Sequence, residues 1–259
     1  MLIPFSKYHG TGNDFIMIDN RQLGLNLTQQ QIAEFCNRRF GIGADGLILV
    51  EVENETVKMV YYISDGAPSS MCGNGGRCFV TFCQRLEVLS DVGEFLAVDG
   101  IHPFKMEDGL VSLQMGNVNS IEEIENAVYL DTGSPHYVKV VEDVLDLDLI
   151  SEAHKIRYNN RFSEKGTNVN FVELMDGVVH IRTYERGVED ETLSCGTGAT
   201  AVAIAMHQQG ITEETTLPIK VLGGKLSISF KPMEHGRYSN VWLTGPTTHV
   251  FDGTIELSL

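Results

Sequence analysis

Two short stretches built on the same plan constrain this chain more than any other feature of its sequence. They are Met71-Cys72-Gly73-Asn74-Gly75-Gly76-Arg77-Cys78 and Leu193-Ser194-Cys195-Gly196-Thr197-Gly198-Ala199. In each, a cysteine is followed by glycine, a polar residue, glycine and a largely apolar run, which is typical of a tight turn opening a buried helix. Unpaired N–H groups and the positive end of the helix dipole stabilise a thiolate at such a position. The sequence therefore predicts two reactive thiols at two helix starts.

The two cysteines also belong to a longer internal correspondence. Cys72 and Cys195 are 123 residues apart, and three further pairs keep nearly the same spacing, namely Gly12 and Gly133, Gly43 and Gly166, and Tyr61 and Tyr184. Matches in order at constant spacing indicate an internal duplication. We predict an α+β fold with two pseudosymmetric domains, 1–118 and 119–246, each a largely antiparallel sheet wrapped around a central apolar helix.

Local signals place the elements between these motifs. Thr28 and Gln31 form a capping box for a helix reaching about Arg39. Asp-Gly turns at 99–100 and 108–109 separate short strands in a meander. In the second half we expect one strand ending at Asp131, a helix around 146–156 and a loop from Glu185 to Ser194. Thr248 to Leu259 is expected to be a final strand.

Composition excludes several classes of function. With 19 Lys and Arg against 35 Asp and Glu, the net charge of −16 argues against nucleic acid and against a basic membrane-binding surface. No apolar run approaches the roughly 20 residues of a membrane span, and the N-terminus does not resemble a secretory signal, so we expect a cytoplasmic protein.

Cysteine and histidine usage points to reduced thiols without a metal. The cysteines number five, an odd count, and no Cys-x-x-Cys pair or metal-ligand spacing of histidines occurs. A disulfide framework and a zinc site are therefore not expected. Cys36, Cys78 and Cys83 lie on apolar helix faces and are interpreted as inert core thiols.

Two thiols flanking one cleft between the domains suit inversion at a carbon atom. One thiolate removes a proton from one face while the other group, as a thiol, supplies a proton to the opposite face. Cysteine fits both roles because its ordinary pKa, about 8.5, makes both forms accessible near neutral pH. A substrate α-carboxylate at the two helix starts would be stabilised by backbone N–H groups as charge develops. The scheme needs no cofactor, and no lysine stands in a pyridoxal phosphate context.

At these residues the sequence resembles the diaminopimelate epimerase family along nearly its whole length. The matching motifs are Lys7-Tyr8-His9-Gly10-Thr11-Gly12-Asn13-Asp14-Phe15, Gly41-Ile42-Gly43-Ala44-Asp45-Gly46, the stretch from Met71 to Cys78, Tyr184-Glu185-Arg186-Gly187 and the stretch from Glu191 to Gly198. The resemblance implies cofactor-independent conversion of L,L-diaminopimelate to the meso form, in the synthesis of lysine and cell-wall precursors. It also implies a homodimer and a last strand, about 247–259, that returns to the first domain.

The resemblance assigns roles to individual residues. Cys72 and Cys195 resemble the two acid/base groups. The residues resembling substrate contacts are Asn13, Gly73, Asn74, Asn168, Glu185, Arg186, Gly196 and Thr197. Within this set, Gly73-Asn74 and Gly196-Thr197 look like the carboxylate-holding turns, and Glu185-Arg186 looks like the segment for the remote amino-acid end. His136 and Glu185 are similar to residues that tune the pKa of the cysteines.

The chain departs from the family pattern at three positions. Ile63 stands where the family usually has asparagine, Ser134 where it often has asparagine, and Gly46 where many members have glutamine. Each of the three positions lacks the amide side chain found in the family, so the departures bear on how the far end of the substrate is held.

Two other functions remain open. The first is a related racemase of proline or hydroxyproline, against which Tyr184-Glu185-Arg186-Gly187 and Asn168 favour a substrate with a charged remote end. The second is a thiol redox or binding module in which Cys72 and Cys195 form a regulatory disulfide. The response to each amino acid and to oxidation separates these functions.

Overall fold

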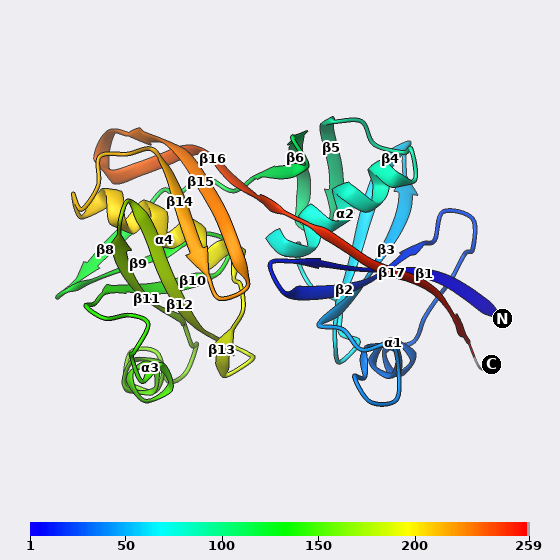
Figure 1. The fold of residues 1–259 in the computed structure, drawn as a ribbon, viewed down its shortest axis with the longest axis horizontal. Helices are drawn as coiled ribbons and strands as arrows, with labels where there is room; N and C mark the ends of the chain where they lie inside the picture. Colours follow the sequence, from blue (N-terminus) through cyan, green and yellow to red (C-terminus); the bar gives the residue numbers. More distant parts are fainter. Residues whose placement is uncertain (258–259) are drawn as a thin grey trace. The chain divides into compact units, whose positions relative to one another are not determined.

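The structure, a computed structural model, describes residues 1–257 and divides into two compact units (Figure 1). Unit 1 comprises Met1–Leu113 with the C-terminal segment Gly245–Leu259, and unit 2 comprises Gln114–Thr244. The proposed boundaries at 118 and 246 stay predictions.

Unit 1 is a mixed sheet with two helices. Its strands are β1 (Leu2–Gly10), β2 (Asn13–Asp19), β3 (Gly46–Glu53), β4 (Thr56–Ile63), β5 (Val92–Ala97), β6 (Gly100–Glu107), β7 (Leu110–Gln114) and β17 (Thr248–Glu256), and its helices are α1 (Gln29–Cys36) and α2 (Gly73–Arg85). The strands pair in the order β17-β1-β2-β3-β4-β5-β6-β7, with β2–β3 and β4–β5 parallel and the other pairs antiparallel.

Unit 2 repeats this plan. Its strands are β8 (Ile121–Ile124), β9 (Ala127–Asp131), β10 (Pro135–Val140), β11 (Asn168–Met175), β12 (Val178–Glu185), β13 (Asp190–Thr192), β14 (Thr216–Val221), β15 (Gly224–Met233) and β16 (Arg237–Pro246), and its helices are α3 (Leu149–Arg157), α4 (Gly196–Gln208) and the 3₁₀ turn η1 (Glu234–Gly236). The order β8-β9-β10-β11-β12-β14-β15-β16 has its parallel pairs at the same two places as unit 1, and β13 adds to β12. The predicted α+β fold with two pseudosymmetric halves is confirmed by this match, strand for strand.

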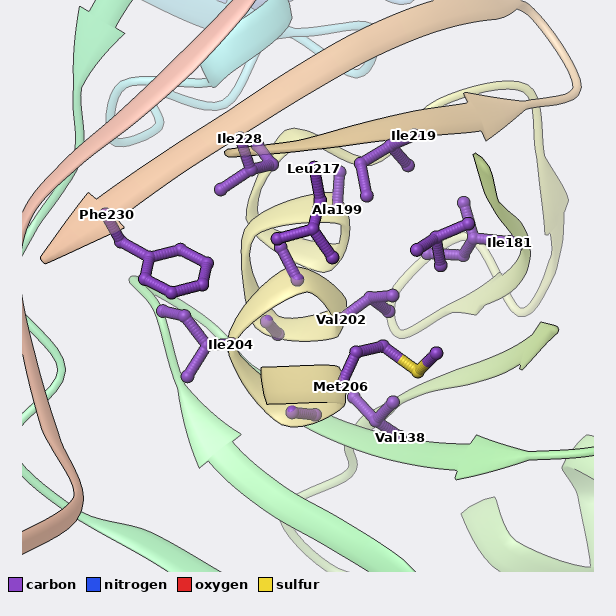
Figure 2. Packing of buried hydrophobic residues seen from close by; sticks show 14 of the residues in the cluster. Val138, Ile181, Ala199, Val202, Ile204, Met206, Leu217, Ile219, Ile228 and Phe230 are labelled. Atoms are coloured by element: carbon purple, nitrogen blue, oxygen red, sulfur yellow. The ribbon is translucent and has the colours of Figure 1, made fainter. Parts of the chain in front are cut away.

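The central helix of each unit organises its core. Every residue of α4 from Gly198 to Met206 is buried, as expected for a helix that is apolar on all sides. Figure 2 shows side chains of the surrounding strands gathered about α4, namely Val138, Ile181, Leu217, Ile219, Ile228 and Phe230. Each such side chain contributes about 1.5–3 kcal/mol when it is fully buried. Helix α2 has the same place in the core of unit 1, against Phe15, Ile48 and Phe95.

Several boundaries differ from the sequence-based expectations. The strand expected to end at Asp131 is β9, which does end there, but its partner β8, across a turn that includes Glu125 at a φ of 49°, was not predicted. The expected loop from Glu185 to Ser194 contains the short strand β13, which gains its backbone partners from β12. Helix α1 ends at Cys36 rather than near Arg39. The final strand ends at Glu256, and residues 258–259 of the expected strand lie outside the described residues.

Candidate active site

Cys72 is the residue that begins α2. Its backbone is extended, with φ −101° and ψ 129°, and its carbonyl accepts the helical bond from the Gly76 N–H at 2.7 Å. The side chain does not cap the helix, so the half-buried thiol lies beside the positive end of the helix dipole. The Sγ atom donates to Asn13 Oδ1 at 3.7 Å.

Asn13 is held in one orientation by its neighbours. Its Nδ2 donates to Asp45 Oδ2 at 2.7 Å, and a carboxylate can only accept there. Its Oδ1 is therefore the atom that faces Cys72, and it also accepts from Asn74 Nδ2 at 3.2 Å. The predicted site residues of unit 1, Asn13, Cys72, Gly73 and Asn74, thus lie together at the start of α2.

Arg77 supports this cluster through hydrogen bonds, and we did not predict a role for it from the sequence. It is 0% exposed, and its guanidinium donates to the Gly73 carbonyl at 3.1 Å and to Asn74 Oδ1 at 3.0 Å. Its Nε has no hydrogen-bond partner among the described residues, and burial lowers the pKa of the guanidinium. An arginine inside an apolar helix is the signal in the sequence, because a buried charge needs a specific reason.

Cys195 begins α4 in the same way that Cys72 begins α2. Its φ and ψ are −122° and 112°, its carbonyl accepts from the Ala199 N–H at 2.9 Å, and its side chain does not cap the helix. The residue is 9% exposed, and its Sγ lies 3.4 Å from Thr197 Oγ1. The same hydroxyl lies 3.0 Å from His136 Nε2.

His136 is a buried, neutral imidazole. It lies on β10 with 0% exposure, and burial together with the charge of Arg186 lowers its pKa to about 3. Asn170 Nδ2 lies 3.1 Å from its Nδ1. Sequence reasoning missed Asn170, although an asparagine at an inward-facing position of a buried strand is a usable signal.

Asn168 joins the second half of the site. Its Nδ2 donates to Ser134 Oγ at 2.9 Å and to the Pro135 carbonyl at 3.0 Å, and its Oδ1 accepts from the Arg186 N–H at 2.9 Å. The Arg186 guanidinium donates to the Lys165 carbonyl at 3.1 Å. Glu185, at the end of β12, directly precedes Arg186.

Hydrogen bonds and close contacts therefore link the predicted residues of unit 2, apart from Glu185, to the start of α4. Thr197 links Cys195 to His136, and Asn168 links the backbone of Arg186 to Ser134, in the turn before β10. The glycines after the two cysteines also match, because Gly196 O accepts from Thr200 Oγ1 at 2.9 Å where Gly73 O accepts from Arg77. Thr200 and Arg77 are 123 residues apart, in the register of the duplication.

The other three cysteines are of a different kind. All five cysteines are free, but Cys36, Cys78 and Cys83 are fully buried in the cores. Burial raises the pKa of Cys36 and Cys78 to about 12 and raises that of Cys83 further, so these thiols stay protonated.

Two other kinds of feature are absent from residues 1–257. No group of three or more His, Cys, Asp or Glu in that range could hold a metal ion, and no helix there is long and apolar enough to cross a membrane.

Comparison with known proteins gives consistent results. A family model described as diaminopimelate epimerase matches residues 5–120 and 128–250. The diaminopimelate epimerase of Flavobacterium psychrophilum is 50% identical over 253 residues, covering 96% of this chain and 98% of that protein. The one from Chlorobaculum tepidum is 40% identical over 259 residues, with 96% and 99% covered.

Solved structures show the same fold at low sequence identity. A phenazine biosynthesis protein of the PhzF family from Bacillus anthracis is 13% identical, with a TM-score of 0.77 and 99% and 100% of the two chains covered. A hydroxyproline epimerase from Agrobacterium vitis is 12% identical, with a TM-score of 0.68 and coverage of 98% and 92%.

Proposed function

Because this chain belongs to the diaminopimelate epimerase family, we propose that Cys72 and Cys195 are the acid and base groups of its reaction. The chain is an isomerase that interconverts L,L- and meso-diaminopimelate, in lysine biosynthesis. The observation that carries the proposal is local: each cysteine begins the central helix of its unit with the same backbone geometry and without capping it.

The reaction needs one thiolate and one thiol. The thiolate of one cysteine takes the α-proton of the substrate, and the electron pair moves into the α-carboxylate to give an enediolate-like state. The thiol of the other cysteine then gives its proton to the opposite face of the same carbon. The reverse reaction exchanges the two roles, so each cysteine must be able to hold either form.

The turns after the cysteines are suited to hold the α-carboxylate. The first N–H groups of a helix lack acceptors within the helix, and the dipole there favours an anion. We assign this role to Gly73-Asn74 at the start of α2 and to Gly196-Thr197 at the start of α4. The bonds from Arg77 and from Thr200 to the carbonyls of Gly73 and Gly196 hold these turns in place.

The remaining predicted substrate contacts lie in both units, and the remote end of the substrate is assigned to Glu185 and Arg186. Asn13 is held by Asp45 in unit 1, and Asn168 receives the Arg186 N–H in unit 2. The guanidinium of Arg186 suits a carboxylate, and Glu185 suits an ammonium group. A charged remote end is what separates diaminopimelate from proline and hydroxyproline, so Asn168 and Arg186 favour diaminopimelate as substrate. His136 and Glu185 are assigned to tuning the pKa of the cysteines.

The test is isotope uptake with matched cysteine variants. In deuterated water the wild-type enzyme is expected to place deuterium at the α-carbon of diaminopimelate. Cys72→Ala and Cys195→Ala should each lower turnover at least about 10²-fold, the usual contribution of a general acid or base. Cys36→Ala removes a buried thiol outside the site and should keep near wild-type turnover. Full activity in either catalytic variant would overturn the two-thiol mechanism.

The same samples test the competing functions. Proline and hydroxyproline, assayed beside diaminopimelate, should gain no deuterium, and uptake only by proline would favour a racemase of that type. Oxidation of the protein should abolish turnover, because a Cys72–Cys195 disulfide would remove both acid/base groups. Retained turnover in the fully oxidised protein would contradict this expectation.

We further propose a cytoplasmic homodimer. Five free cysteines suit a reducing compartment, and the family resemblance supports the dimer. Light scattering after size-exclusion chromatography measures the mass directly, and a value near the 28.6 kDa of one chain would contradict the dimer.

A further inference from the structure

A chain of hydrogen bonds leads from the interior of unit 2 to the sulfur of Cys195. It runs from Thr183 through Asn170, His136 and Thr197, with separations of 3.0, 3.1 and 3.0 Å, and ends 3.4 Å from the sulfur. Its polar side chains are almost completely enclosed at the inner end, since Asn170 and His136 are 0% exposed. Backbone carbonyls next to the chain can only accept hydrogen bonds, and they determine the direction of each bond.

Asn170 sets the direction of the chain. Its Nδ2 lies 3.1 Å from the Tyr137 carbonyl, which can only accept, so the amide nitrogen must be on that side. Its Oδ1 accepts from Thr183 Oγ1, the neighbour directly across the β11–β12 pair. Since the NH₂ group faces His136 Nδ1, that ring nitrogen must be the acceptor.

The imidazole then carries its one proton on Nε2. His136 is neutral, because burial and the positive charge of Arg186 lower its pKa to about 3. Asn168 Nδ2 also lies 3.5 Å from Nε2, but its two protons are directed at Ser134 and at the Pro135 carbonyl. The Nε2–H group therefore donates to Thr197 Oγ1, and the hydroxyl proton of Thr197 is left for the sulfur.

Building on the proposed function, we infer that Asn170 is a positioning residue that fixes the His136 tautomer, so that Thr197 donates a hydrogen bond to Cys195. Such a bond stabilises the thiolate form of Cys195 without placing a charge in the core of unit 2. Asn170 and Cys195 are both packed closely against Gly198, because a Cβ there would lie 2.9 Å from Asn170 Oδ1 and 3.3 Å from Cys195 Sγ.

Unit 1 uses a different arrangement at the matching thiol. There the Sγ of Cys72 faces an acceptor, Asn13 Oδ1, and the buried positive charge of Arg77 lies one turn further along the helix. The chain through Asn170 ends at Cys195, and all of its residues belong to unit 2.

The first experiment reads the tautomer in the unaltered enzyme. In a ¹⁵N-labelled sample, two-bond ¹H–¹⁵N correlations distinguish Nε2–H from Nδ1–H, and His136→Gln identifies the signals of this ring. We expect Nε2–H for His136. A proton on Nδ1 would overturn the inference, whether or not the protein is an epimerase.

The second experiment measures the rate at which iodoacetamide alkylates Cys195, by peptide mass spectrometry at neutral pH without substrate. Asn170→Leu and Thr197→Val should each slow alkylation about tenfold, because a hydrogen bond to a charged group is lost. Thr197→Ser keeps the hydroxyl and should keep the wild-type rate. Thr197→Ser is therefore the matched control for Thr197→Val.

Wild-type alkylation in both Asn170→Leu and Thr197→Val would refute the proposed direction of the bond. If Asn170→Leu fails to fold, the inference is still tested by the tautomer of His136 in the unaltered enzyme and by the alkylation rates of Thr197→Val and Thr197→Ser. Alkylation requires no turnover, so this result is independent of the outcome for the two-thiol mechanism.

Discussion

Gly10 offers a sharp test of how the first half of the site is supported. It is the last residue of β1, and a Cβ built there would lie 3.0 Å from the Asn74 carbonyl and 3.1 Å from an Arg77 guanidinium nitrogen. Its φ is not in the left-handed region, so alanine is disfavoured at this position by space alone. The neighbour that must move is the first turn of α2, whose Asn74 side chain is tied to Arg77 and Asn13.

The expected size of the effect follows from these contacts. Overpacking in a close-packed interior costs about 1–3 kcal/mol, because the backbone must give by a few tenths of an ångström. Alanine also lowers the conformational entropy of the unfolded chain, and this stabilises the folded protein by about 0.4–1 kcal/mol. We therefore expect Gly10→Ala to lower the free energy of unfolding of unit 1 by about 1–2 kcal/mol. Since a 1 Å misplacement costs about 10²-fold in rate, a shift of a few tenths should lower turnover about three- to tenfold.

The assay must separate the two units. Hydrogen exchange of the α2 amides reports the local stability of unit 1, whereas the fluorescence of Trp242, the single tryptophan, reports unit 2 and should not change. Gly116→Ala is the matched control, because a Cβ there meets nothing within 4 Å and the backbone is outside the left-handed region. If Gly10→Ala matches Gly116→Ala in α2 protection and in turnover, the close approach of β1 and α2 has no energetic consequence and the reasoning fails.

Two further predictions concern acid stability and substrate holding. Burial raises the pKa of the Asp14 and Glu189 carboxyl groups, but bonds from Arg38 to Asp14 and from Arg157 to Glu189 outweigh it, and the pKa of Glu189 falls to about 2. Because both folded pKa values lie below the unfolded ones, their stabilisation is present above about pH 4.5 and is lost as the pH falls toward 2. Asp14→Asn and Glu189→Gln should therefore each weaken the fall in the free energy of unfolding as the pH drops below about 4.5. Denaturant titrations at several pH values measure this fall, and the wild-type pH dependence in both variants would contradict the prediction. Ser134→Ala removes an acceptor of the Asn168 amide. The loss of this hydrogen bond, about 1 kcal/mol, should lower kcat/KM about fivefold in steady-state kinetics. An unchanged kcat/KM would contradict this prediction.

The duplicated architecture could be predicted because the motifs that indicate it are short and each one is recognisable by itself. A cysteine, two glycines and an apolar run specify a turn and a buried helix without reference to the rest of the chain. The spacing of 123 residues between Cys72 and Cys195 then required each half to repeat its strands. The repeated order of parallel and antiparallel pairs is what such a duplication produces.

Elements that depend on tertiary partners could not be predicted in this way. Strand β13 is three residues long and exists because Asp190–Thr192 pairs with the end of β12. The β8–β9 hairpin turns at Glu125, a residue that ordinary turn signals do not include. The roles of Arg77 and Asn170 likewise depend on which atoms surround them in the folded core, and sequence spacing alone does not give this.

The departures from the family pattern fall into two physically different groups. Ser134 keeps a polar atom where it is needed, since its Oγ accepts from Asn168 at 2.9 Å and lies 3.5 Å from a guanidinium nitrogen of Arg186. The shorter side chain therefore still serves the residues assigned to the far end of the substrate.

Gly46 and Ile63 form the second group and belong together. They are directly opposite each other in the β3–β4 pair, at the end of both strands. A Cβ at position 46 would lie 2.6 Å from the Tyr61 ring and 2.6 Å from the Tyr62 carbonyl, so a longer side chain there requires β4 to move. Because Tyr61 also packs edge-on against Phe15, that movement would reach the core under α2. The two departures thus lie side by side at one end of the β3–β4 pair, and placing a larger residue at position 46 alone would strain β4.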